Sequence, residues 1–241
     1  MNWSHFESDL FNKYIHTINN NSSKNIVLFG SCHMSTIGYM LNKLLNYKSN
    51  EYNIHIIISW FFEKNGIEKF DMKKINDNIG YLVSTCDVFI HHPHINDYSV
   101  NATILPSITK DSCLKLIIPN YRLDYTSEQS KFSKSLNILS YHILNSSFPE
   151  FSFVFENYKN IIFFNTPNHP THYLLFLQTE AIRNRILNEG GNINIHYYFD
   201  NNNRNYFKQI DNNYVYLPGK ESITHNISTN TGININADYF D

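Results

Sequence analysis

Short apolar, β-branched runs alternate along the chain with longer amphipathic stretches, a pattern typical of a parallel sheet with crossover helices. The apolar runs predict five buried strands, at Asn25–Phe29, Ile54–Ser59, Asp87–Ile90, Leu114–Ile118 and Asn160–Phe164. The amphipathic stretches predict four helices, at Met34–Leu45, Ile67–Val83, Ser127–Leu144 and Thr171–Asn188. The predicted fold class is therefore α/β, with a central, mostly parallel five-stranded sheet.

The last fifty or so residues follow a different pattern. Gly190–Gly191 ends the last predicted helix in the expected way. Beyond it, Asn192–Phe199 and Tyr214–Leu217 alternate between apolar and polar residues, as half-buried strands do. We therefore expect residues 1–191 to form the α/β domain and residues 192–241 a small C-terminal extension packed on it.

Composition and charge exclude several classes of protein. The 241 residues carry 19 Lys+Arg against 21 Asp+Glu, and this near-neutral balance argues against a nucleic-acid-binding protein. The longest apolar run, Ile54–Phe62, is too short to span a membrane, and the N-terminus lacks the pattern of a signal peptide. Three cysteines cannot build a disulfide framework and fit a reducing compartment. We expect a cytoplasmic globular protein; whether it forms a homo-oligomer stays open.

In open α/β sheets, ligands bind at the carboxyl ends of the strands. The first predicted strand is followed by Gly30, Ser31, Cys32 and His33, and Gly30 suits a tight turn into the next helix. Cys32 would then lie near the helix N-terminus, where the dipole favours a thiolate and free N–H groups can stabilise an oxyanion. The alternative is that Cys32 is a small apolar filler beneath the turn.

The fifth predicted strand is followed by Asn168 and His169, which lie between two prolines just before a helix. His169 occupies the strand end at which hydrolase-like folds place a general base, so Cys32 and His169 form a candidate nucleophile–base pair. No acidic residue closely precedes His169, so a third member would be Asn168, Thr166, a backbone carbonyl or a distant acid.

Other strand ends carry candidate binding residues. His91, His92 and His94 follow the third strand, and we expect one of them to contact substrate, with metal binding as the weaker alternative. Arg122, after the fourth strand, could bind a phosphate or carboxylate or pair with Asp124.

These blocks resemble the WcbI family of polysaccharide-biosynthesis acetyltransferases. The family's Gly-Asn-Cys-Gln block is similar to Gly30–His33, and its second block is similar to Cys86–His91 together with Leu116–Pro119. Its third block, Asn-His-Pro-Thr at the start of a long helix, matches Asn168–Thr171. Ser31, His33 and His91 stand where the family has Asn, Gln and Gln. The resemblance covers about residues 25–190.

The resemblance implies a three-layer, SGNH-hydrolase-like α/β sandwich that binds coenzyme A and no metal. It also implies acetyl transfer from acetyl-CoA to a nucleotide-linked amino sugar or a sugar hydroxyl in surface glycan biosynthesis. Catalysis would rest on Cys32 and His169, either through an acetyl-cysteine or with His169 activating the acceptor directly. The binding residues would be Gly30, Ser31, His33, His91, Tyr121, Arg122, Asn168 and Thr171, with Tyr121 able to stack on a sugar.

Three other functions fit the same residues. The first is an esterase or deacetylase on the same scaffold, because transfer and hydrolysis differ chiefly in whether a sugar or water reaches the acyl group. The second is a metallohydrolase that uses His91, His92 or His94 together with His169 and His172. The third is a glycan-binding module without catalysis.

Overall fold

The computed structural model describes residues 14–46, 49–93, 104–121, 129–157, 164–166, 169–189, 197–200, 205–210 and 213–217. The chain divides into two compact units, one of residues 1–118 and 182–189 and the other of residues 119–181 and 190–241. The chain thus passes between the two units after Ile118, after Ala181 and after Glu189.

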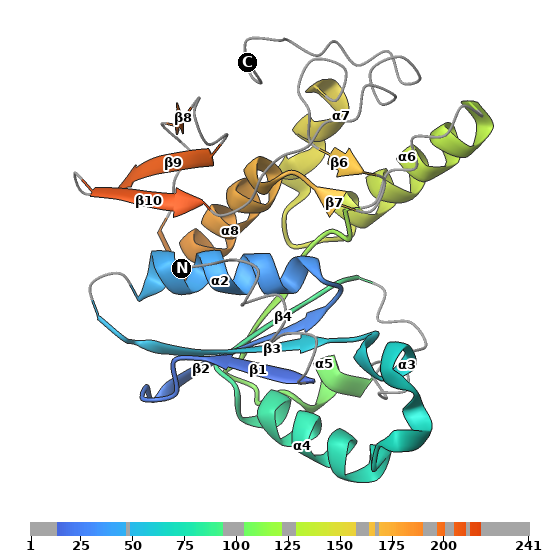
Figure 1. Ribbon diagram of the computed structural model, residues 1–241, viewed down its shortest axis with the longest axis vertical. Helices are drawn as coiled ribbons and strands as arrows, with labels where there is room; N and C mark the ends of the chain where they lie inside the picture. Colours follow the sequence, from blue (N-terminus) through green and yellow to red (C-terminus); the bar gives the residue numbers. More distant parts are fainter. Residues whose placement is uncertain are drawn as a thin grey trace. The chain divides into compact units, whose positions relative to one another are not determined.

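The first unit is built on a five-stranded, mostly parallel sheet, which confirms the α/β class (Figure 1). The strand order is β1 (Ile15–Ile18), β3 (Tyr52–Ile58), β2 (Lys24–Gly30), β4 (Val88–His91) and β5 (Leu114–Ile117). Neighbouring strands pair in parallel except β1, which runs antiparallel to β3 at the edge of the sheet.

The membership of this sheet differs from the prediction at one strand. Four predicted strands correspond to β2, β3, β4 and β5, but the fifth member is β1 and not Asn160–Phe164. Phe164 begins β6 (Phe164–Thr166), which pairs antiparallel with β7 (His169–Pro170) in a separate two-stranded sheet. Residues 160–163 lie outside the described residues. The edge strand β1 was missed because His16 and Thr17 interrupt its apolar pattern.

The central strands are apolar on both faces because helices cover both. Figure 1 shows α2 (His33–Leu45) on one face of the sheet and α4 (Met72–Thr85) and α5 (Leu105–Ile108) on the other. The side chains of β2 from Ile26 to Phe29 are fully buried, as expected for a parallel strand covered on both sides. Helix α2 packs closely on β3 at Gly38, where an added Cβ would lie 2.6 Å from Cδ1 of Ile56.

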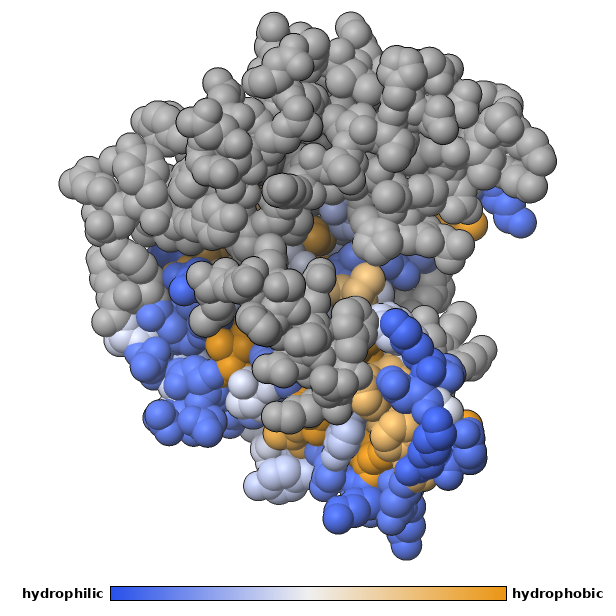
Figure 2. Space-filling model, in the orientation of Figure 1, coloured by the Kyte–Doolittle hydropathy of each residue, from blue (hydrophilic) through white to orange (hydrophobic). Residues whose placement is uncertain are grey.

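Helix α4 is amphipathic and follows two short helices, α3 (Phe61–Asn65) and η1 (Ile67–Lys69). It begins at Met72, later than predicted, because the Asp71 carboxylate accepts a hydrogen bond from the backbone N–H of Lys74 and caps the helix. Its buried face carries Ile75, Ile79 and Val83. Figure 2 shows that hydrophilic side chains prevail on the part of the surface where α4 lies in Figure 1.

The second unit contains helices and short antiparallel strands. Its helices are α6 (Gln129–Leu144), η3 (Pro149–Ser152), α7 (Phe153–Asn157) and most of α8 (His172–Leu187), whose last residues, 182–187, belong to the first unit. Beyond α8, strands β8 (Tyr197–Asp200), β9 (Asn205–Ile210) and β10 (Asn213–Leu217) form an antiparallel sheet. The predicted strand Tyr214–Leu217 corresponds to β10, and residues 197–199 of the predicted strand Asn192–Phe199 belong to β8, while residues 192–196 lie outside the described residues.

Candidate active site

The carboxyl ends of β2, β4 and β5 bring a serine and a histidine together. The parallel register sets Phe29 opposite His91, and His91 opposite Ile117, so the residues that follow these three positions meet at one edge of the sheet. There, Oγ of Ser31 lies 3.1 Å from Nε2 of His92. Nδ1 of His92 lies 3.3 Å from the carbonyl oxygen of Ile118.

The partners of His92 determine which of its nitrogens carries the proton. A carbonyl oxygen can only accept a hydrogen bond, so Nδ1 of His92 donates to Ile118 and carries the hydrogen in the neutral ring. Nε2 then carries the lone pair of the ring and accepts the hydrogen bond from the Ser31 hydroxyl. This tautomer is the one that a general base needs in order to take a proton from a serine.

Gly30 is required at this site for close approach of the His92 ring. A Cβ at position 30 would lie 2.5 Å from Cδ2 of His92, a distance that real Cβ contacts do not reach, and 3.0 Å from Nε2 of the same ring. Positive φ among the described glycines occurs only at Gly66, so the left-handed backbone is not the reason for Gly30. The sequence argument assigned Gly30 to the tight turn, whereas the structure shows close packing of the His92 ring against it.

The backbone of Gly30 is also fixed from β3. Its carbonyl oxygen accepts hydrogen bonds from the backbone N–H of Ser59 at 2.8 Å and from the Ser59 hydroxyl at 3.0 Å. Ser59 is 2% exposed and directly follows β3. These two bonds set the direction in which the chain leaves β2, and therefore the position of Ser31.

Cys32 is the N-cap residue of α2, as the sequence predicts, and its side chain is half-buried. Burial raises the pKa of its thiol, and the backbone N–H groups of Cys32 and His33, which act in the opposite direction, do not offset that effect. The N–H groups at the helix start therefore favour the thiolate, as expected, but burial has the larger effect and the pKa is raised. The same two N–H groups stand at the start of the helix next to Ser31.

The neighbouring histidines are buried and differ in their contacts. His33 packs edge-on against the His92 ring, with 6.4 Å between the ring centres. Nδ1 of His91 donates to the carbonyl oxygen of His92 at 2.7 Å, and burial lowers the pKa of His91. Of the two adjacent histidines, His92 and not the favoured His91 reaches Ser31. A contact between His91 and substrate stays a prediction.

Two residues predicted to bind ligand in the second unit have structural roles instead. Tyr121 is 1% exposed, and its hydroxyl donates to Oε1 of Gln178 at 2.6 Å, so its ring cannot stack on a sugar. Thr171 is fully buried, and its Oγ1 accepts from the backbone N–H of Leu174 at 3.3 Å, which caps the start of α8. Both are corrections, and burial is the reason for each.

The remaining candidates lie outside what the structure describes. Arg122, Asn168 and His94 are outside the described residues, and for His169 and His172 only the backbone is described. His169 begins β7, opposite Thr166. Cys32 and His169 belong to different units, so their pairing stays a prediction.

The Ser31–His92 pair is the part of the site that the sequence argument missed. Ser31 was treated as a replacement beside Cys32, and His92 as one of three histidines. The sequence feature that could have indicated the pair is the alternation of side chains in an extended segment. Consecutive residues face opposite ways, so only one of His91 and His92 can reach the end of β2. Among the residues whose side chains are described, no group of three His, Cys, Asp or Glu is arranged to hold a metal.

In comparisons with protein-family models, curated proteins and solved structures, no match to this chain was found. None of the helices among the described residues has the length and apolar character to cross a membrane.

Proposed function

We propose that this chain is an acyltransferase that carries the acyl group on Ser31, with His92 as general base. The observation that carries the proposal is the pair of hydrogen bonds that joins Ser31 Oγ, the His92 ring and the Ile118 carbonyl oxygen. A serine in contact with a correctly protonated imidazole is the arrangement of serine acyl-transfer enzymes, in which a third group orients the ring.

The two half-reactions use the same two side chains. Nε2 of His92 takes the proton of Ser31 as Oγ attacks the acyl carbonyl, and the new C–O bond gives a tetrahedral oxyanion. The backbone N–H groups of Cys32 and His33 at the start of α2 directly follow Ser31 in the sequence, and we propose them as hydrogen-bond donors to that oxyanion. His92 then returns the proton to the leaving group, and the acyl ester remains on Ser31.

Deacylation reverses these roles. Nε2 of His92 takes the proton of the acceptor hydroxyl or amine, the acceptor attacks the ester carbonyl, and Ser31 Oγ leaves and regains the proton. Ser31 is half-buried. In this arrangement Cys32 shapes the site and is not acylated.

Donor, acceptor and fold family follow the resemblance to WcbI-type enzymes. We propose acetyl-CoA as donor and a sugar hydroxyl or nucleotide-linked amino sugar in a surface glycan pathway as acceptor, on an SGNH-hydrolase-like scaffold. The scaffold is supported by the position of Ser31 directly after β2, the central strand of the sheet. Arg122 stays the candidate contact for a coenzyme A phosphate.

The second candidate is an esterase or deacetylase that uses the same residues. The same observation favours it, because a serine paired with a histidine needs only water as acceptor to hydrolyse an ester. In that case, His92 would activate water in the second half-reaction.

An assay with two substrates distinguishes these functions. Purified protein is given acetyl-CoA with a panel of sugars and nucleotide sugars, and separately a p-nitrophenyl acetate solution. Sugar-dependent release of coenzyme A supports the transferase, whereas hydrolysis of the aryl ester with no use of acetyl-CoA supports the esterase. Ser31→Ala and His92→Gln should abolish either activity, while Ser84→Ala, a matched change on α4, should not. Full activity in Ser31→Ala would refute the proposal.

A further inference from the structure

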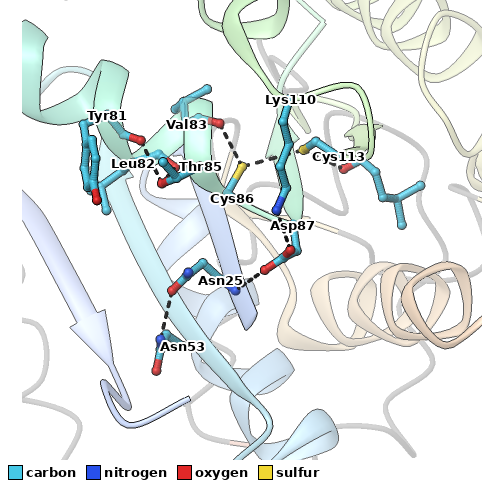
Figure 3. A network of polar contacts seen from close by, with 11 residues as sticks. Asn25, Asn53, Tyr81, Leu82, Val83, Thr85, Cys86, Asp87, Lys110 and Cys113 are labelled. Atoms are coloured by element: carbon cyan, nitrogen blue, oxygen red, sulfur yellow. Dashed lines mark hydrogen bonds and ion pairs between the residues drawn. The ribbon is translucent and has the colours of Figure 1, made fainter. Parts of the chain in front are cut away.

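The amino ends of β4 and β5 bring two cysteines into contact, away from the Ser31 site at the carboxyl ends. Cys86 ends α4 just before β4, and Cys113 directly precedes β5. Their sulfur atoms lie 3.7 Å apart, and Figure 3 shows the two joined by a dashed line. At this distance the two sulfurs are in direct contact, within reach of a thiol hydrogen bond in which either sulfur can be the donor.

The surrounding contacts hold both cysteines in place. The backbone N–H of Cys113 donates to the carbonyl oxygen of Lys110 at 2.9 Å, and the N–H of Leu114 donates to the carbonyl oxygen of Asp87 at 2.9 Å. The side chains of the same two residues also interact, because Nζ of Lys110 forms an ion pair with Oδ1 of Asp87 at 2.7 Å (Figure 3). The thiol of Cys86 donates to the carbonyl oxygen of Val83 at 3.2 Å.

The two thiols differ in access and in acidity. Cys86 has no exposed surface, whereas Cys113 is 7% exposed, so a small oxidant reaches Cys113 first. The hydrogen-bonding contact with the Cys86 sulfur lowers the pKa of Cys113, and the nearby ammonium groups of Lys110 and Lys115 act in the same direction, which outweighs the opposing effect of burial. The same contact and burial raise the pKa of Cys86. Cys113 is therefore the better nucleophile of the pair.

We propose that Cys86 and Cys113 are a site of reversible oxidation, at which a small peroxide converts the two thiols to a disulfide. A disulfide needs the two sulfurs at about 2.05 Å, so they must approach by about 1.7 Å from their present contact. Rotation of the two side chains supplies part of that approach, and a small movement of the turn before β5 supplies the rest. The bond would join the end of α4 to the start of β5.

The chemistry takes two balanced steps. The Cys113 thiolate attacks one oxygen of hydrogen peroxide, the O–O bond breaks, and the released hydroxide takes a proton to become water; Cys113 is oxidised to a sulfenic acid. The sulfur of Cys86 then attacks the sulfur of Cys113, the S–O bond breaks, and the leaving hydroxide takes the Cys86 proton to form a second water. Two thiols are oxidised and one peroxide is reduced.

Counting free thiols by mass tests the proposal on the full chain. The three cysteines of the reduced protein should accept three N-ethylmaleimide labels after denaturation. After treatment with dilute hydrogen peroxide the protein should accept one label, and dithiothreitol should restore three. Peptide mapping should find Cys86 linked to Cys113. Three labels after peroxide, or a link that involves Cys32, would overturn the proposal.

Two variants separate the pair from Cys32 and assign the order of steps. Cys32→Ala leaves only the pair, so its label count should fall from two to zero. In Cys86→Ser the sulfenic acid on Cys113 has no partner and should be trapped by dimedone, whereas in Cys113→Ser dimedone should not label Cys86. If Cys86→Ser does not fold, the Cys32→Ala count decides alone. Peroxide-treated Cys32→Ala that gains oxygen atoms without a link would refute the disulfide.

Discussion

Nε2 of His92 lies 3.1 Å from Oγ of Ser31, although the two residues are 61 positions apart in the chain. The contact follows from the parallel pairing of β2 and β4, which ends both strands at the same edge of the sheet. The third partner, the Ile118 carbonyl oxygen, comes from the next strand in the same way. The ends of three neighbouring strands therefore each supply one member of the hydrogen-bonded series Ser31, His92 and Ile118.

Gly30→Ala should disable the site by displacing the His92 ring. The new Cβ would lie 2.5 Å from Cδ2 of His92 and 2.9 Å from Cε of Met34, so the His92 ring must shift from its present position beside Ser31. We expect a loss of acyl-transfer activity of about 100-fold or more, as for loss of a general base, and destabilisation of about 1–3 kcal/mol from overpacking. Steady-state kinetics and urea unfolding measure the two effects.

Gly38→Ala is the matched control for that change. Its Cβ would lie 2.6 Å from Cδ1 and 2.8 Å from Cγ1 of Ile56, a buried side chain that is not part of the proposed site. We expect a change in the free energy of unfolding but unchanged turnover per folded molecule. Equal loss of turnover in both variants would show that crowding beneath α2, and not displacement of His92, causes the effect.

Cys32 should react slowly with iodoacetamide at neutral pH. Burial raises the pKa of its thiol above the ordinary value of 9.0, so little thiolate is present near pH 7. The rate of alkylation of the Cys32 peptide, followed by mass spectrometry, should rise with pH without levelling off before about pH 9. Rapid alkylation at pH 7 would contradict this and would favour a Cys32 nucleophile paired with His169.

Because of the Asp87–Lys110 ion pair, the free energy of unfolding should decrease at acidic pH. Burial alone would raise the pKa of Asp87, but the Lys110 ammonium and the backbone N–H of Asn25 outweigh it and hold the pKa below its usual value. The stabilisation is therefore present above about pH 4 and is lost as the pH falls through the lower folded-state value. The difference in free energy of unfolding between wild type and Asp87→Asn should shrink from pH 6 to pH 3. A constant difference would contradict this account.

Tyr121 and Gln178 should behave as a coupled buried pair. Tyr121→Phe removes the donor to Oε1 of Gln178 and leaves a buried acceptor without its partner, which costs about 1–3 kcal/mol. Adding Gln178→Leu should recover much of this loss, because both polar groups are then absent. The free energies of unfolding are measured in urea for the two single variants and the double variant. If the two losses add, the hydrogen bond does not account for the stabilisation.

Much of the fold follows from the apolar pattern, because strands covered on both faces must be apolar throughout. Residues 26–29 and 54–58 show this signal clearly, and the structure has strands there. The strand β1 was not predicted, because a short strand at the edge of a sheet contains few apolar residues. The helix start at Met72 depended on a single capping carboxylate, that of Asp71, which periodicity does not report.

The candidate site depends on contacts that the sequence does not report. The strand-end rule led to Gly30, Ser31 and Cys32, but it could not rank two adjacent nucleophiles, since that depends on which one a distant imidazole reaches. Whether a side chain can bind a ligand or only packs in the core also depends on its burial, and Tyr121 is buried in the core. Neither the register of β2 against β4 nor the exposure of one tyrosine can be obtained from local sequence.

The central claim is that the acyl group is carried on Ser31, and trapping the acyl-enzyme tests it most directly. Protein mixed with p-nitrophenyl acetate or acetyl-CoA is quenched in acid, its mass is measured, and the peptide with Ser31 and Cys32 is sequenced by tandem mass spectrometry. We predict one acetyl group on Ser31, present in Cys32→Ala and absent in Ser31→Ala. An acetyl group on Cys32, or one that persists in Ser31→Ala, would contradict the account.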